Sequence, residues 1–67
     1  MRFTNLNIGY VIRKQTINPA VDWLYWNADR EMWVGLYDAT IYENRNAAEA
    51  ATLTHGEVWV TTVHYNK

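Results

Sequence analysis

The chain has 67 residues, of which 49% are hydrophobic and 19% are charged, as expected for one small globular domain spanning residues 1–67. It contains neither cysteine nor serine, which excludes disulfides, thiolate metal sites, cysteine nucleophiles and the serine triad. The formal net charge of −1 predicts no strong attraction to nucleic acid or anionic lipid.

The first half of the sequence predicts three strands. Residues 7–14 form the first, and Asn18 followed by Pro19 ends it, because proline lacks an amide donor and disfavours helix in the residue before it. Residues 22–26 form the second, since tryptophan, tyrosine and leucine suit a pleated surface. Residues 27–30 resemble a turn that joins it to a third strand at 31–37 as a hairpin. Residues 38–42 form an extended connector.

One helix and a last strand complete the chain. Residues 45–53 are rich in alanine, the best helix former, with Asn44 or Asn46 as the cap and Gly56 as the stop. Residues 57–65 are strand formers. The order β-β-β-α-β predicts an α+β domain, in which one short helix packs on a face of a small antiparallel sheet of three to four strands. The helix residues expected to face the sheet are Ala47, Ala50, Ala51 and Leu53.

Ten aromatic residues are the most distinctive feature of the sequence. Strand alternation places Trp23 and Tyr25 on one face of the second strand and Trp26 on the other. The third and last strands also carry apolar groups on both faces. Because a nine-residue helix covers only one face, we expect either a partner or a loop such as 15–21 on the other. The alternative is that the aromatics simply form the core.

Catalytic and metal-binding signatures are lacking. His55 and His64 stand nine residues apart on different elements, which is no recognised ligand spacing. The acidic residues are scattered, and the chain leaves little room for a water-excluding site. We therefore predict no enzyme activity, no cofactor and no metal. The three glycines are isolated, so no phosphate-binding loop is predicted.

Several short segments resemble a class of very small phage and prophage proteins. These segments are residues 10–13, 25–26, 31–34, 39–42, 46–51 and 58–60. The shared pattern is an aromatic-Val-Ile strand, a Trp/Tyr hairpin, an Ala/Glu helix and a Val-rich strand. The resemblance implies an accessory protein without enzyme activity. Some phage proteins of this size, anti-CRISPR inhibitors among them, bind and block a host protein.

These observations predict a phage-type protein that blocks a host or viral protein surface. The predicted binding residues are Trp23, Tyr25, Trp26 and Trp33 on the hairpin, with Arg30 at the turn. One alternative is a homodimer in which the same patch binds itself. The other, less favoured because the basic residues are spread out, is single-stranded nucleic-acid binding through the aromatic face. With no secretory signal and no apolar run of membrane-spanning length, we expect a cytoplasmic location in the host cell and no membrane partner.

Overall fold

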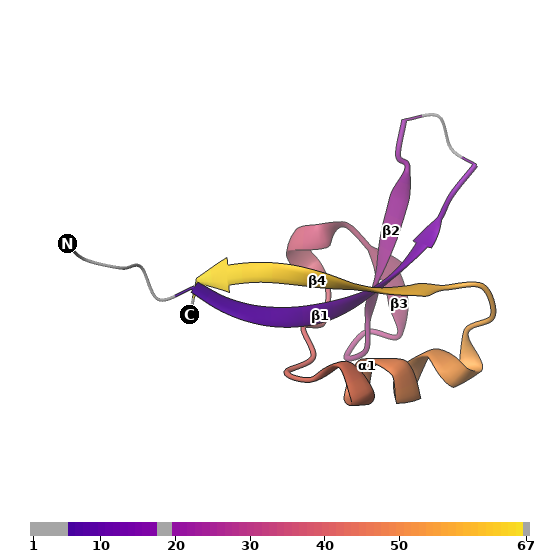
Figure 1. The fold of residues 1–67 in the computed structure, drawn as a ribbon. Helices are drawn as coiled ribbons and strands as arrows, with labels where there is room; N and C mark the ends of the chain where they lie inside the picture. The colour runs from indigo at the N-terminus through magenta and orange to yellow at the C-terminus, as the bar shows by residue number, and fades with distance from the viewer. Residues whose placement is uncertain (1–5, 18–19, 67) are drawn as a thin grey trace.

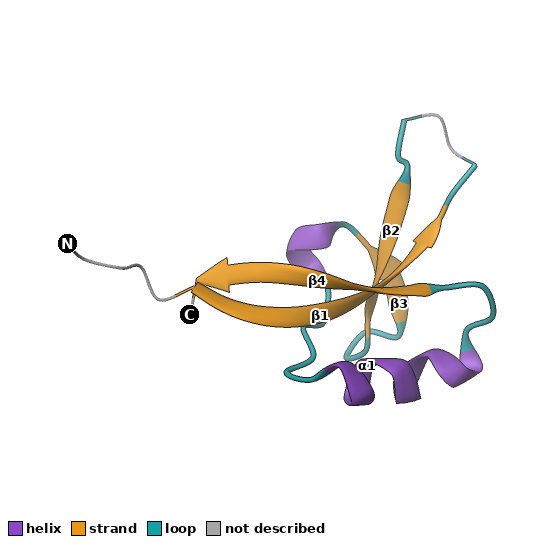
Figure 2. Cartoon of the chain, in the orientation of Figure 1, coloured by secondary structure: helices purple, strands orange, loops and turns teal. Residues whose placement is uncertain are grey.

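The computed structural model describes residues 6–17 and 20–66, so the predicted break at Asn18 and Pro19 lies outside the described residues. Its four strands form one antiparallel sheet in the order β3-β2-β1-β4 (Figure 1). One helix and two single-turn 3-10 segments complete the fold (Figure 2). The elements are β1 (Leu6–Gln15), β2 (Trp23–Asn27), β3 (Met32–Val34), η1 (Leu36–Asp38), α1 (Arg45–Ala51), η2 (Thr52–Thr54) and β4 (Trp59–Asn66). The predicted α+β class is confirmed.

Strand β1 is the centre of the sheet because it pairs along both of its sides. Its register with β4 is unbroken from Leu6 opposite Asn66 to Arg13 opposite Trp59. On the other side, β2 pairs only with the last three residues of β1. The connector continues that side, since Tyr10 and Tyr42 exchange two backbone hydrogen bonds of 2.9 and 2.8 Å.

The predicted hairpin between the second and third strands is confirmed. Asn27 closes the turn, because its Oδ1 accepts a 2.8 Å hydrogen bond from the backbone N–H of Arg30. Glu31, the last turn residue, has a φ of 53°, in the left-handed region. The side chain of Asn27 also donates to the carbonyl of Asp38, which ties the connector to the hairpin.

The prediction that the third strand runs to residue 37 is wrong. The strand ends at Val34, and the backbone then turns into η1 through hydrogen bonds from Asp38 N–H to the Gly35 carbonyl and from Ala39 N–H to the Leu36 carbonyl. Each bond is 3.1 Å long. Tyr37 therefore projects into solvent instead of sharing a sheet face with Trp33.

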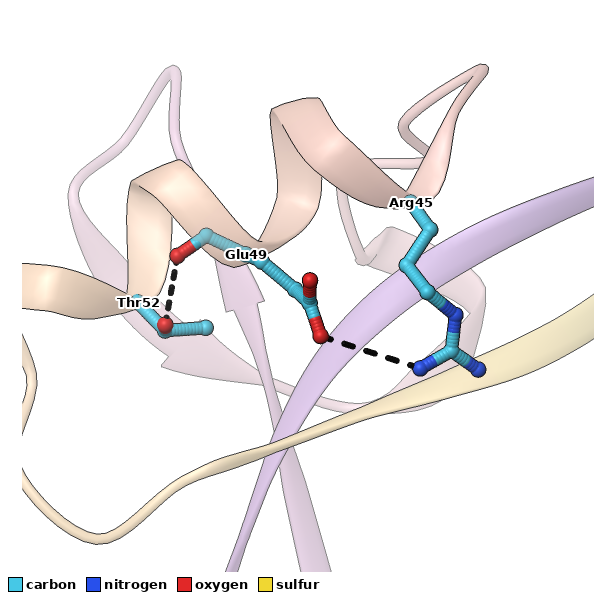
Figure 3. A network of polar contacts seen from close by, with 3 residues as sticks. All are labelled: Arg45, Glu49 and Thr52. Carbon is cyan, nitrogen blue, oxygen red and sulfur yellow. Dashed lines mark hydrogen bonds and ion pairs between the residues drawn. The ribbon is translucent and has the colours of Figure 1, made fainter.

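Helix α1 begins where one of the two predicted caps stands. The Oδ1 of Asn44 accepts a 2.8 Å hydrogen bond from the Ala47 N–H. An Arg45–Glu49 ion pair of 3.8 Å and a hydrogen bond from the Thr52 hydroxyl to the Glu49 carbonyl follow along the helix (Figure 3). Gly56, with a φ of 78°, follows the helical segment as predicted.

The prediction of which helix residues face the sheet is wrong by about one position in the sequence. The shielded helical stripe is instead Ala48, Ala51, Thr52 and His55, which has the i, i+3, i+4, i+7 spacing of a single helix face. Ala47 and Ala50 are exposed, and Leu53 is 84% exposed. Only the part of the prediction that concerns Ala51 is confirmed.

The core is thin and lies on both faces of β1. Among the described residues, the fully buried hydrophobic side chains are Val11, Ile12 and Ala48. Val11 and Ile12 are consecutive strand residues, so their side chains point to opposite faces. Figure 1 shows α1 on one side of the β1–β4 ribbon and η1 on the other. Each face is therefore covered in part, and by a different segment.

Candidate functional site

The strand register assigns each aromatic side chain to one of the two sheet faces. We call the face that carries α1 the helix face; it includes Tyr10, whose ring lies 5.6 Å from the guanidinium carbon of Arg45 on that helix. The opposite, open face includes Arg13, which pairs with Tyr25 on one side and with Trp59 on the other. Residues directly opposite in a ladder share a face, so this register fixes the assignment.

On the open face, two tryptophans from different strands meet across β1. The rings of Trp23 and Trp59 lie 5.7 Å apart at 87°, an edge-to-face contact. The guanidinium carbon of Arg13 lies 3.9 Å from the centre of the Trp23 ring, within cation–π range. Trp59 is 48% exposed and Met32 47% exposed. We call this set the Trp23–Trp59 surface; its members are Arg13, Trp23, Tyr25, Met32 and Trp59.

Arg13 is the unusual member of this surface. Its Nε atom is buried and makes no hydrogen bond to any described part of the chain. Arginine stays charged at every physiological pH, and a buried donor without an acceptor destabilises the fold that contains it. The contact with the face of Trp23 offsets part of that cost. The arrangement places a cation among aromatic rings, with one buried donor that no described residue accepts.

A second aromatic cluster lies on the helix face, where the helical segment ends. His55 lies 4.3 Å from Trp26 and 5.7 Å from Trp33, measured between ring centres, and the two tryptophans are 5.2 Å apart. The Nζ of Lys14 lies 4.6 Å from the centre of the Trp33 ring. All four side chains are partly shielded. This cluster packs the helical segment against the hairpin.

The five residues predicted to bind thus fall in three places. Trp23 and Tyr25 belong to the open-face surface, whereas Trp26 and Trp33 pack around His55 on the helix face. Arg30 is exposed in the hairpin turn. Sequence reasoning did not select Arg13, Trp59 or Met32 for the surface. Alternation gave their relative phase within each strand, but only the pairing of the strands shows that these three side chains lie on the same sheet face.

The open face also holds a cavity of about 330 Å³. Its wall is mostly apolar and consists of Val11, Leu36, Tyr37, Ile41, Val63, His64 and Tyr65. Leu36 and Ile41 therefore partly cover this region of the open face. The loop predicted to do so, 15–21, does not: Ile17 is fully exposed and Val21 is 40% exposed. Its residues 18–19 lie outside the described part of the chain.

Other chemical features of the described residues are few. Burial raises the pKa of the Tyr42 phenol above its ordinary value. In residues 6–17 and 20–66, no three His, Cys, Asp or Glu side chains gather where a metal ion would be held. No helix among those residues is long and apolar enough to cross a membrane. Comparison of the chain with models of known families, with curated proteins and with solved structures finds no match.

Proposed function

We propose that this protein is a non-enzymatic binding module that occludes a surface of another protein, with the Trp23–Trp59 surface as its anchor. The observation that carries the proposal is the partly shielded Arg13 cation, held against Trp23 in the open sheet face beside the half-exposed Trp59. Tryptophan, tyrosine and arginine are the residue types that dominate binding energy at protein interfaces. The resemblance to small phage accessory proteins supports an inhibitor that acts on a host protein in the host cytoplasm.

The chemistry of Arg13 specifies what the partner carries. A carboxylate is the natural acceptor for a guanidinium and binds it more strongly than a neutral acceptor does. The two residues that flank Arg13 on this face, Tyr25 and Trp59, are aromatic, and Trp59 is about half exposed. The partner surface that fits is therefore an apolar patch with an acidic side chain near its centre.

The charges argue against the nucleic-acid alternative. Arg13 and Lys14 form the only adjacent basic pair in the sequence, but consecutive strand residues point to opposite faces. Each already lies over a tryptophan, Arg13 over Trp23 and Lys14 over Trp33. A binding groove for single strands needs cations that follow the backbone along one face, and this pair is divided between two.

The test compares two surface variants with a matched control. Met32→Glu places a charge on the Trp23–Trp59 surface, and Arg13→Gln removes the cation. Leu53→Glu introduces the same charge at an exposed apolar site on η2. Immobilised wild type is used to capture proteins from a host lysate, and the affinity of each variant for the captured protein is then measured.

We expect Met32→Glu and Arg13→Gln to weaken binding at least tenfold, and Leu53→Glu to bind like the wild type. The captured protein should lose its own activity when the wild type is bound. Equal binding by all three variants would refute the proposed surface. Captured protein that keeps full activity would refute the blocking role. Circular dichroism of each variant establishes that it is folded before its affinity is compared.

A further inference from the structure

The outer strand β4 lacks the features that usually protect a sheet edge. Its sequence from Trp59 to Asn66 has no proline and no Asp, Glu, Lys or Arg. Its pairing with β1 runs through eight consecutive residue pairs without a bulge. The other edge strand, β3, has only three residues. Short strands, charges, prolines and bulges are how proteins prevent edge pairing, and β4 has none of them.

The pairing of β4 with β1 determines which backbone N–H and carbonyl groups of β4 point out of the sheet edge. Tyr10 directs its N–H and carbonyl toward Tyr42, on the side of β1 away from β4. Backbone groups alternate in direction along antiparallel strands, so Thr62, which lies opposite Tyr10, directs its own groups away from β1. The same alternation applies to Val60 and His64. In the described part of the chain, no strand pairs with that edge.

We infer that two copies of this chain pair through β4, antiparallel and related by a two-fold axis at Thr62. Antiparallel pairing of identical strands is self-complementary, as a closed dimer requires. Val60 then pairs with His64 of the second copy, and about six hydrogen bonds form across the axis. The two four-stranded sheets become one continuous sheet.

Side chains favour this register. With Thr62 on the axis, Trp59 lies directly opposite Tyr65 of the second copy on the open face, and Thr61 lies opposite Val63. Cross-strand aromatic pairs stabilise antiparallel sheets, and Trp59 is half exposed in the single chain. Tyr65 and Val63 also line the open-face cavity, so this wall of the cavity would extend into the second copy.

Thr62, at the proposed axis, is exposed in the single chain. Figure 1 shows the β1–β4 ribbon continuing beyond α1 toward the ends of the chain. Pairing covers the flank of Trp59 at the sheet edge and leaves the face above Trp23 open. The two Trp23–Trp59 surfaces then lie on the same side of the joined sheet.

The experiment measures the mass of the purified chain by light scattering and sedimentation across a range of concentrations. We expect a dimer in the wild type. Thr62 is exposed, and Thr62→Lys or Thr62→Glu places like charges opposite each other at the axis, so each should raise the dimer Kd at least tenfold. An equimolar mixture of the two variants should form a heterodimer. Thr54→Lys, at an exposed site on η2, is the control and should dimerise like the wild type.

Hydrogen exchange of the wild type provides a readout that needs no variant. The amides of Val60, Thr62 and His64 should exchange more slowly as the protein concentration rises, and the amide of exposed Thr54 should not change. A wild type that stays monomeric at millimolar concentration, or Thr62→Lys dimers of unchanged affinity, would overturn the inference. Both measurements use the chain alone, so their result does not depend on the proposed protein partner.

Discussion

A single glycine decides how closely the connector approaches the sheet. Gly9 is buried on the open face of β1. A Cβ built at this position would clash with the Ile41 side chain and would lie 2.9 Å from the Tyr65 ring and 3.3 Å from the Tyr42 carbonyl. The missing side chain thus allows residues 41–42 to lie against β1, where Tyr42 completes the backbone bridge to Tyr10. Glycine is needed here for space rather than for an unusual backbone angle.

Replacing Gly9 tests this close approach. Gly9→Ala should lower the free energy of unfolding by about 1–3 kcal/mol, the usual cost of forcing extra atoms into a packed site. Gly35→Ala is the control, because a Cβ at Gly35 meets no atom within 4 Å and its φ of −71° suits any residue. Urea unfolding followed by circular dichroism measures both. Equal stabilities of the two variants would mean that Ile41 and Tyr65 move aside freely.

At the scale of the elements, local signals predicted where strands and the helix form. Aromatic and β-branched residues marked all four strands, and the alanine run with an asparagine cap marked the helix. These local signals failed where a contact between residues far apart in the sequence determines where an element ends. The strand from Met32 ends at Val34 because the backbone turns into η1 and Asn27 holds the Asp38 carbonyl, eleven residues away in sequence.

The candidate surface was harder to predict for the same reason. Alternation alone placed Trp23 with Tyr25 and separated both from Trp26, as the structure shows. It did not bring Arg13 or Trp59 to them, because the pairing partners and the register of β1 are not local properties. The phase of the helix was also missed. Four alanines in one short segment give weak contrast between its faces, so His55 is the clearest mark of the packed side.

The helix cap gives a prediction at this scale. Asn44→Ala should destabilise the protein by about 1 kcal/mol, because the Ala47 N–H loses its acceptor. Asn46→Ala is the matched control: Asn46 is exposed and lies inside the helix, where alanine is the better helix former. Asn46→Ala should therefore leave stability unchanged or slightly raised. Thermal unfolding of the two variants compares them, and the reverse order would contradict the assignment of the cap.

The described part of the chain is extended for its length. Its radius of gyration is 12.8 Å and it measures 44 × 29 × 19 Å, whereas a compact domain of this length has a radius of about 11 Å. The β1–β4 ribbon accounts for much of the length in Figure 1. An extended shape buries little area, so few of the described side chains are fully shielded. Because β1 joins both halves of the sheet, loss of its central contacts should affect every element.

Replacing Ile12 measures how far the other elements depend on the central contacts of β1. It is completely buried on the helix face of β1, and truncating such a residue to alanine costs about 2–5 kcal/mol. A domain of this size has about 3–10 kcal/mol of stability in total, so Ile12→Ala should leave a chain that is barely folded or unfolded. Ile8→Ala is the control, since Ile8 lies on the same strand and the same face but is 57% exposed.

Two probes of urea unfolding complete this test. Far-UV circular dichroism reports the backbone, and tryptophan fluorescence reports the packing of β2, β3 and β4. If β1 couples the two halves, both probes should give one coincident transition in the wild type and in Ile8→Ala. In Ile12→Ala both signals should be lost together. A fluorescence transition that separates from the circular dichroism transition would show that the hairpin and the β1–β4 ribbon unfold independently, and the role assigned to β1 would then be wrong.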